Sequence, residues 1–156
     1  GGNEERMRLR RIMRLHNTTE NGLGWAFPSG VVNVFSAGNR RPLAGAGRMK
    51  QTRTGEYMEI DLGPSEDLLA EALPVERGSR REGQMEIHHR IRIDNSLPFT
   101  VPVQWEHDPD SSLQWRVLNS NAEDTLEDGV LTLSHRVPAE ETRVLDFTLE
   151  FVQPAL

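Results

Sequence analysis

Residues 85–93 read Met-Glu-Ile-His-His-Arg-Ile-Arg-Ile, and residues 145–151 read Leu-Asp-Phe-Thr-Leu-Glu-Phe. In both stretches the apolar side chains recur at every second position, which is the spacing of a β-strand that buries one face. A shift of one residue would turn each apolar set towards solvent, so the alternation also fixes the register of the strand. Each stretch therefore predicts a strand with one buried face.

The same period of two runs through most of the chain. It recurs in residues 7–15, 31–35, 58–62, 99–105, 113–117 and 131–137. Turn residues such as Pro28-Ser29-Gly30 and Asp128-Gly129 separate the runs. Strands spaced about 8–14 residues apart without long helices between them are typical of an antiparallel sandwich or barrel. We therefore predict an all-β fold, an immunoglobulin-like antiparallel β-sandwich of about 8–10 strands.

Residues 65–73 carry signals for two different structures. Ser65 suits a helix N-cap, acidic residues fill the turn that would follow, and Pro74 would stop the helix. The flanking segments are predicted strands, and tertiary context easily overrides the helix propensity of nine residues. A strand and a short helix are therefore both open for this segment.

The composition limits the classes of protein that the chain can belong to. It has 156 residues, a net charge of −6 and no cysteine, which excludes disulfides, thiolate zinc sites and iron–sulfur clusters. No apolar run approaches the ~18 residues of a membrane-spanning helix, so we expect no transmembrane segment. We assign residues 1–5 to a cloning scar or linker, because Gly1-Gly2-Asn3 starts without methionine, and residues 6–153 to a single β-sandwich domain.

Basic side chains are concentrated in the first third of the chain. Residues 1–53 hold ten basic and three acidic side chains, whereas residues 54–156 hold eight basic and 21 acidic ones. Arg8, Arg10 and Arg14 share one face of the first predicted strand. This face can lie beside acid-bearing strands of its own sheet, or it can meet acidic loops of a neighbouring copy or of the parent chain. We expect no nucleic-acid binding, because the segment lacks interleaved aromatic side chains for base stacking.

Histidine and acidic residues raise the question of metal binding. His89 and His135 fall on the apolar faces of their strands, either as hydrogen-bonded boundary residues or as two ligands of a metal. A zinc ion would need further ligands that the sequence does not place. Residues 106–112 and 123–128 are acidic, which suits solvated hairpin loops or a calcium site. We assign no metal and no cofactor.

Trp25 is the candidate anchor for a ligand. Trp105 and Trp115 follow the core alternation, whereas Trp25 lies in a loop that contains glycines. Nearby, Asn17-Thr18-Thr19 matches a glycosylation sequon, a pattern that also occurs by chance. No Gly-x-Ser-x-Gly nucleophile elbow is present, and no catalytic residue can be assigned, so we expect no enzyme.

Several motifs occur in an order that points to one family. They are Asn17 and residues 22–24, 27–35, 43–45, 52–56, 60–63, 86–95, 98–103, 137–141 and 145–151. This order resembles domain-of-unknown-function family 4139, found in mucoidy-inhibitor-like and other bacterial proteins, and the resemblance covers about residues 6–152. It implies an all-β domain at the C-terminal end of a larger, often exported or envelope-associated protein. It transfers no catalytic residues.

Together these observations predict a non-catalytic assembly or docking module. Its partners would be other proteins, domains of the parent chain or a second copy of itself, bound through strand edges. The candidate binding residues are Arg8, Arg10, Arg14 and Trp25. The alternative is a carbohydrate- or peptide-binding module that uses end loops around Trp25. A location in the cell envelope or outside the cell rests on the family resemblance alone.

Overall fold

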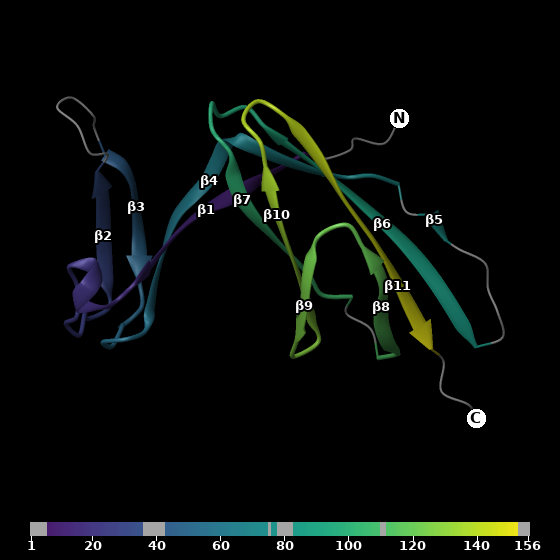
Figure 1. Cartoon of the computed structure of the whole chain (residues 1–156), viewed down its shortest axis with the longest axis horizontal. Helices are drawn as coiled ribbons and strands as arrows, with labels where there is room; N and C mark the ends of the chain where they lie inside the picture. Colours follow the sequence, from purple (N-terminus) through teal and green to yellow (C-terminus); the bar gives the residue numbers. More distant parts are fainter. Residues whose placement is uncertain (1–5, 36–42, 75, 78–82, 110–111, 153–156) are drawn as a thin grey trace. The chain divides into compact units, whose positions relative to one another are not determined.

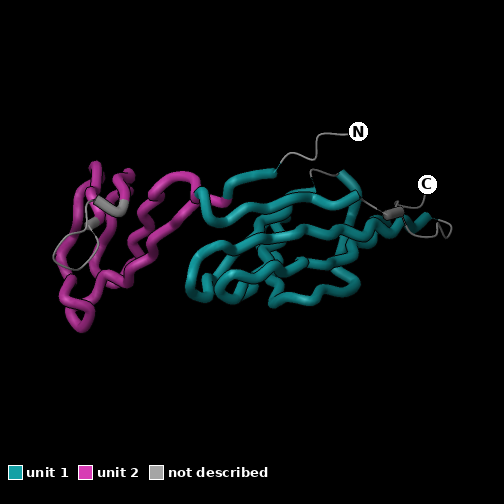
Figure 2. The backbone as a smooth tube through the Cα atoms, turned by 90° about the horizontal axis from the view of Figure 1, so that it is seen from above, with its two compact units in different colours: residues 1–8, 66–156 teal, residues 9–65 magenta. Residues whose placement is uncertain are grey.

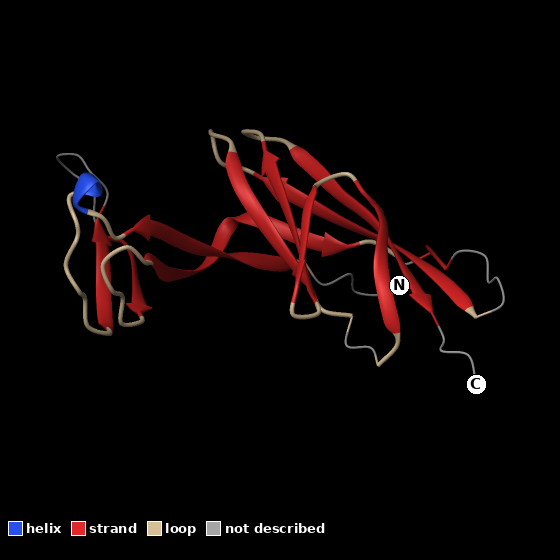
Figure 3. Ribbon diagram, turned by 60° about the horizontal axis from the view of Figure 1, so that its bottom comes forward, coloured by secondary structure: helices blue, strands red, loops and turns tan. Residues whose placement is uncertain are grey.

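The computed structural model describes residues 6–35, 43–74, 76–77, 83–109 and 112–152 (Figure 1). Within these ranges the chain forms strands and one short 3₁₀ helix, which Figure 3 colours separately. The elements are β1 (Met7–His16), η1 (Thr19–Asn21), β2 (Gly30–Phe35), β3 (Leu43–Met49), β4 (Tyr57–Ala72), β5 (Glu76–Arg77), β6 (Gln84–Asn95), β7 (Val101–His107), β8 (Gln114–Ser120), β9 (Glu123–Glu127), β10 (Val130–Val137) and β11 (Thr142–Val152). The prediction of an all-β protein with antiparallel sheets is confirmed.

By its internal contacts the chain divides into two compact units, while the expectation of one domain over residues 6–153 stays a prediction. Unit 1 comprises residues 1–8 and 66–156, and unit 2 comprises residues 9–65 (Figure 2). Strands β1 and β4 are neighbours in one sheet, and each contributes residues to both units. Residues 1–5, expected to be a scar or linker, lie outside the described residues.

The main sheet of unit 1 has the strand order β4-β6-β11-β8. In the long β6–β11 ladder Leu145 lies opposite Ile91, and Leu149 lies opposite Ile87. Leu145, Phe147 and Leu149 are completely buried. Burying each such side chain contributes about 1.5–3 kcal/mol, so the alternation that predicts these strands also builds their core.

A second sheet of unit 1, β7-β10-β9, packs against the same core. Leu131 and Leu133 of β10 are buried, and Val137 ends the buried row. The ring of His107, from β7, lies 5.2 Å from that of Phe147 in the main sheet. The two sheets of unit 1 therefore share one apolar layer.

The segment 65–73 is extended rather than helical. Residues 57–72 form β4, and Leu68–Ala72 pairs with residues 95–91 of β6. Leu68 and Ala70 are buried, as alternation on a strand requires. The strand is favoured because the β6 ladder satisfies the backbone along the segment, whereas an isolated helix of nine residues is marginal in water.

Unit 2 is a thin two-layer structure in which the β2–β3 hairpin lies against β4. Val32 lies opposite Gly47 in the hairpin. A Cβ atom on Gly47 would lie 2.1 Å from the carbonyl oxygen of Asp61, so only glycine permits this approach of β3 to β4. Met49, Met58 and Ile60 form the buried part of this unit. The small core depends on close backbone contact instead of large side chains.

Candidate functional site

The three candidate arginines of β1 lie opposite acidic side chains of β4. Arg10 Nε donates to Asp61 Oδ2 at 2.7 Å, and this hydrogen bond, helped by the Gly63 N–H, lowers the pKa of the Asp61 carboxyl. Arg14 lies 3.6 Å from Glu59, and Arg8 lies 3.6 Å from Glu66. The structure therefore places Arg8, Arg10 and Arg14 beside acidic residues of their own sheet, which was one of the two interpretations of this row.

Tyr57 of β4 is exposed, and its ring is in contact with two side chains of β1. The His16 ring stacks on it at 4.4 Å between centroids, with 12° between the planes. The Arg14 guanidinium lies 4.1 Å from the same centroid. Both groups are at stacking distance from the one ring, so part of its π surface is already in contact with β1 side chains.

Trp25 is 67% exposed and lies on a loop whose backbone is held by hydrogen bonds to the Asn17 side chain. Asn17 Nδ2 donates to the Trp25 carbonyl at 2.7 Å, and Asn17 Oδ1 accepts the Gly24 N–H at 2.9 Å. Asn17 has no exposed surface, and Nδ2 also donates to the Arg53 carbonyl, so the sequon asparagine is committed to the fold. The loop presents an exposed indole on an ordered backbone, which is how binding hot spots are built.

His89 meets His107, and not His135, in the core of unit 1. The His89 and His107 rings are 4.7 Å apart, and His89 stacks on Phe147 at 5.1 Å. Burial, with the nearby charges of His107 and His88, lowers the pKa of His89 to about 4. Burial also lowers the pKa of His107 against the opposing effect of Asp108. Both rings are therefore neutral aromatic packing groups at neutral pH.

No metal site is formed in the part of the chain that the structure describes. There, no three His, Asp or Glu side chains lie close enough together to hold one ion. Residues 123–128 form the exposed strand β9 and the start of its turn, and part of the other acidic segment, residues 110–111, lies outside the described residues. The described ranges also contain no helix with the length and apolarity needed to cross a membrane.

Most arginines of unit 1 whose side chains the structure describes are paired with carboxylates. The paired ones whose side chains are described are Arg6, Arg8, Arg90, Arg92, Arg116 and Arg143. Arg136 of β10 is different. Within the described residues its guanidinium has neither an ion pair nor a hydrogen bond. Among the described arginine side chains of unit 1, it is the one with a charge left over for a ligand.

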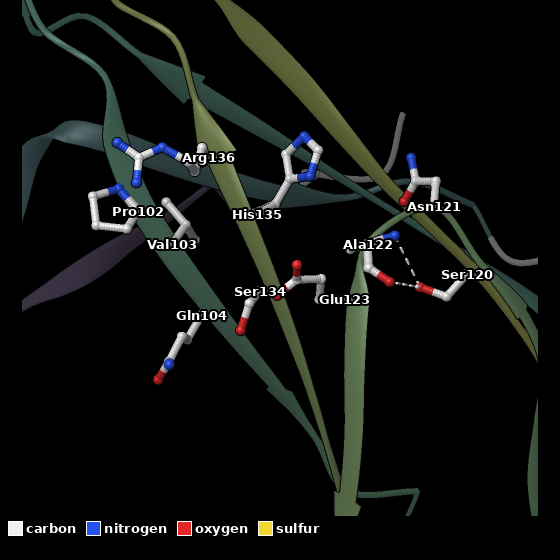
Figure 4. Close-up of a pocket in the computed structure, with 10 residues that line it drawn as sticks. All are labelled: Pro102, Val103, Gln104, Ser120, Asn121, Ala122, Glu123, Ser134, His135 and Arg136. Atoms are coloured by element: carbon white, nitrogen blue, oxygen red, sulfur yellow. Dashed lines mark hydrogen bonds between the residues drawn. The ribbon is translucent and has the colours of Figure 1, made fainter.

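Arg136 lines an open pocket of about 770 Å³ on unit 1 (Figure 4). The lining residues are Pro102, Val103, Gln104, Ser120, Asn121, Ala122, Glu123, Ser134, His135 and Arg136. The pocket forms because β9 starts at Glu123, opposite Ser134, whereas β10 continues to Val137. Beyond Ser134 the described part of β10 is paired only with β7. The volume lies within the ~300–1,000 Å³ range of ligand pockets.

One wall of this pocket is rigid. The Ser120 hydroxyl bonds both the carbonyl and the N–H of Ala122, each at 3.1 Å, as the dashed lines of Figure 4 show. Asn121 Nδ2 donates to the Val144 carbonyl at 2.7 Å, and its Oδ1 accepts the Asp146 N–H at 2.9 Å. The β8–β9 turn is therefore held by hydrogen bonds within the turn and by hydrogen bonds to β11.

The other wall consists of polar side chains without partners. Gln104 and Ser134 lie opposite each other on β7 and β10, and Arg136 extends over Pro102. His135 extends from β10 towards the side of Asn121. In the described structure none of the Gln104, Ser134, His135 and Arg136 side chains makes a hydrogen bond or ion pair. Gln104, Ser134 and Arg136 share one face of the sheet and can bind a ligand there without breaking an existing contact, whereas His135 belongs to the opposite face.

Sequence reasoning did not identify this pocket. It placed His135 on the buried face of its strand and did not single out Gln104, Ser134 or Arg136. The available signal was His135 itself, a polar residue at an apolar position of an otherwise regular strand. The structure brings His135 and Arg136 together with the first residue of the acidic segment, Glu123.

Comparison with protein-family models, curated proteins and solved structures gave no match to the chain. The resemblance to family 4139 is accordingly a prediction from the order of motifs in the sequence. The geometry of the pocket, of the Arg8, Arg10 and Arg14 row and of the Trp25 loop is the remaining ground for a functional argument.

Proposed function

We propose that this chain is a non-catalytic docking or assembly module of a larger protein that acts through protein–protein contacts. The observation that carries the proposal is β10, whose end beyond Ser134 has a strand neighbour on one side only and borders an open pocket. A strand directs its N–H and C=O groups to alternate sides, so backbone groups at His135–Arg136 face the unpaired side. Such groups can pair with an extended segment of a partner.

The rest of the proposal follows the family resemblance. The parent protein would be a bacterial protein of family 4139, exported or attached to the cell envelope. The two sheets of unit 1, packed on one apolar layer, support an immunoglobulin-like sandwich for this unit. The Arg8, Arg10 and Arg14 row contributes less to docking in this proposal than the sequence suggested, because each arginine already has an acidic neighbour.

A second candidate function is carbohydrate or peptide binding at Trp25. The exposed indole on a fixed backbone favours it. Indole rings bind both sugar faces and apolar peptide side chains, so the Trp25 loop alone does not choose between these ligands. Its contact would be made by unit 2, and not by the β10 pocket of unit 1.

Selection of a displayed library of twelve-residue peptides on the purified chain, with a glycan array in parallel, tests the two functions. The docking module is expected to yield peptides that bind in the micromolar range and shift the amide NMR signals of β10 or of other strand edges. Saturable glycan binding that Trp25→Ala abolishes, together with an empty peptide selection, would establish the second function instead. Trp115→Phe is the matched tryptophan control, since Trp115 is a half-buried residue of β8.

A further inference from the structure

We infer that the β10 pocket of unit 1 binds an extended, acidic peptide segment whose carboxylate is held by Arg136. This inference rests on the proposed docking function and names the chemistry of its partner. Three observations carry it: the unpaired side of β10, the free guanidinium of Arg136 and the uncommitted polar side chains around it.

The backbone of β10 selects an extended chain. β9 occupies one side of β10 from Val130 to Ser134 and ends there. A segment placed along the same line would meet His135 and Arg136, and it would pair with the backbone N–H and C=O of whichever of the two directs them away from β7, as β9 pairs with the residues before them. Hydrogen bonds from Asn121 to β11 hold the β8–β9 turn in place. This turn therefore limits how far a bound segment can extend towards β9.

The side chains select an acidic residue. Six described arginines of unit 1 pair with carboxylates, and Arg136 has none. Guanidinium–carboxylate bonds are charge-assisted and are frequently bidentate, so a Glu or Asp of the partner is the group that fits Arg136. Ser134 and Gln104 lie beside it on the same side of the sheet and supply neutral hydrogen-bonding groups.

Glu123 defines where the acidic residue sits. It lines the pocket opposite Ser134, two positions along β10 from Arg136, and has no ion pair in the described structure. A ligand carboxylate is repelled near Glu123 and attracted near Arg136. The pocket therefore distinguishes the two ends of an extended segment, and a segment with one acidic residue binds in one register.

Blocked hexapeptides of alternating Thr and Val, with Glu, Gln or Lys at one central position, test the inference by ¹H–¹⁵N NMR titration of the whole chain. The Glu peptide is expected to bind about tenfold tighter than the Gln peptide and to shift the amides of His135, Arg136 and Ala122. The Lys peptide is expected to bind most weakly. A Glu peptide with an N-methylated backbone is expected to lose most of its affinity.

Three variants identify the groups responsible. Arg136→Gln is expected to remove the preference for Glu over Gln, while Arg143→Gln, an arginine already paired with Glu141 outside the pocket, leaves it intact. Glu123→Gln is expected to strengthen binding of the Glu peptide about two- to threefold. Equal affinity for all three peptides, or a preference for Glu that survives Arg136→Gln, would overturn the inference.

The titration also separates this inference from the docking function on which it rests. Peptides that bind at another strand edge, such as β7 or β8, would overturn the β10 pocket and leave the docking function standing. If neither these hexapeptides nor the twelve-residue library yields a binder on any edge, both are wrong.

Discussion

Two buried asparagines, one in each unit, end a strand in the same way. Asn17 follows β1 in unit 2, and Asn95 is the last residue of β6 in unit 1; each is almost completely buried. Asn17 Oδ1 accepts the Gly24 N–H, as Asn95 Oδ1 accepts the Leu97 N–H at 2.9 Å. The Nδ2 groups donate to backbone carbonyls of other segments, those of Trp25 and Arg53 for Asn17, and those of Phe99, Val137 and Pro138 for Asn95.

The difference lies in what surrounds the two side chains. Asn95 closes a unit with a broad apolar layer, which includes Phe147 and Leu133. Asn17 closes a unit whose buried side chains are few and whose two layers touch through Gly47. The hydrogen bonds of the buried asparagine therefore supply a larger share of the stability of unit 2 than of unit 1. Backbone contacts and loop hydrogen bonds replace apolar area there.

The largest expected effect is a substitution that separates the two layers of unit 2. In Gly47→Ala the new Cβ meets the Asp61 carbonyl oxygen, a backbone atom that cannot rotate away. We expect a loss of about 3 kcal/mol, the upper end of overpacking costs. Hydrogen exchange of β3 and β4 amides should accelerate, while exchange in β11 stays unchanged.

Gly30→Ala is the matched control, because a Cβ there meets no atom within 4 Å. It should leave exchange in both units as in the parent protein. Equal effects of the two substitutions would show that the approach of β3 to β4 is not what holds unit 2 together.

Removal of the two asparagines should rank next. Asn17→Ala and Asn95→Ala each leave several buried backbone groups without a hydrogen-bond partner. We expect each substitution to lower the free energy of unfolding by about 2–3 kcal/mol. In Asn17→Ala the amide hydrogens of unit 2 are expected to exchange almost as fast as in an unfolded chain. In Asn95→Ala the amide hydrogens of β6 and β11 are expected to exchange more slowly than those of the adjoining loops.

The loop of Trp25 reports on the same pair of substitutions. Its heteronuclear NOE at the indole N–H should fall in Asn17→Ala and stay unchanged in Asn95→Ala. Similar loss of protection in both units would contradict the view that unit 2 depends more heavily on its asparagine.

The fold was predictable where the information is local. Alternation in residues 85–93 and 131–137 predicts β6 and β10 because burial on one face constrains every second residue. It does not decide residues 65–73, where the local helix signals of Ser65 and Pro74 yield to the ladder with β6. Nor does it reveal the division into units, which depends on contacts between segments far apart in sequence.

The candidate site was less predictable for a related reason. Sequence composition shows that arginines are numerous, but the register of neighbouring strands decides that Arg10 meets Asp61 and that Arg136 meets no acid among the described residues. The pocket exists because β9 ends opposite Ser134 while β10 continues. Neither fact leaves a periodic signal in the chain.

Acid should weaken unit 1 through its half-buried histidines, His89 and His107. The pKa of His89 is about 4 in the fold against 6.5 when unperturbed, so between these values the unfolded chain binds the proton more readily. Stability should fall as the pH drops from about 6.5 to about 4 and level off below. For a half-exposed ring, solvent screening reduces the effect to about 1–2 kcal/mol.

Urea unfolding at several pH values, followed by exchange in β6, measures this slope. His89→Gln should flatten it, and Ile87→Val, on the same face of β6, should lower stability while keeping the slope. The lowered pKa of His107 acts in the same direction, so a residual slope is expected in His89→Gln. A slope that His89→Gln leaves unchanged would assign the acid sensitivity to other groups.

The smallest expected effects come from the ion pairs, and they sharpen the contrast between the units. Arg92 bonds Glu71, whose side chain is only 9% exposed, so Arg92→Gln leaves a poorly solvated carboxylate and should cost about 1–2 kcal/mol. Arg10→Gln removes a solvated pair with Asp61 and should leave the unfolding midpoint unchanged within error. Unit 2 then owes its stability to Asn17 and Gly47 and not to the arginine row of β1; a loss in Arg10→Gln as large as that in Arg92→Gln would restore a structural role to that row.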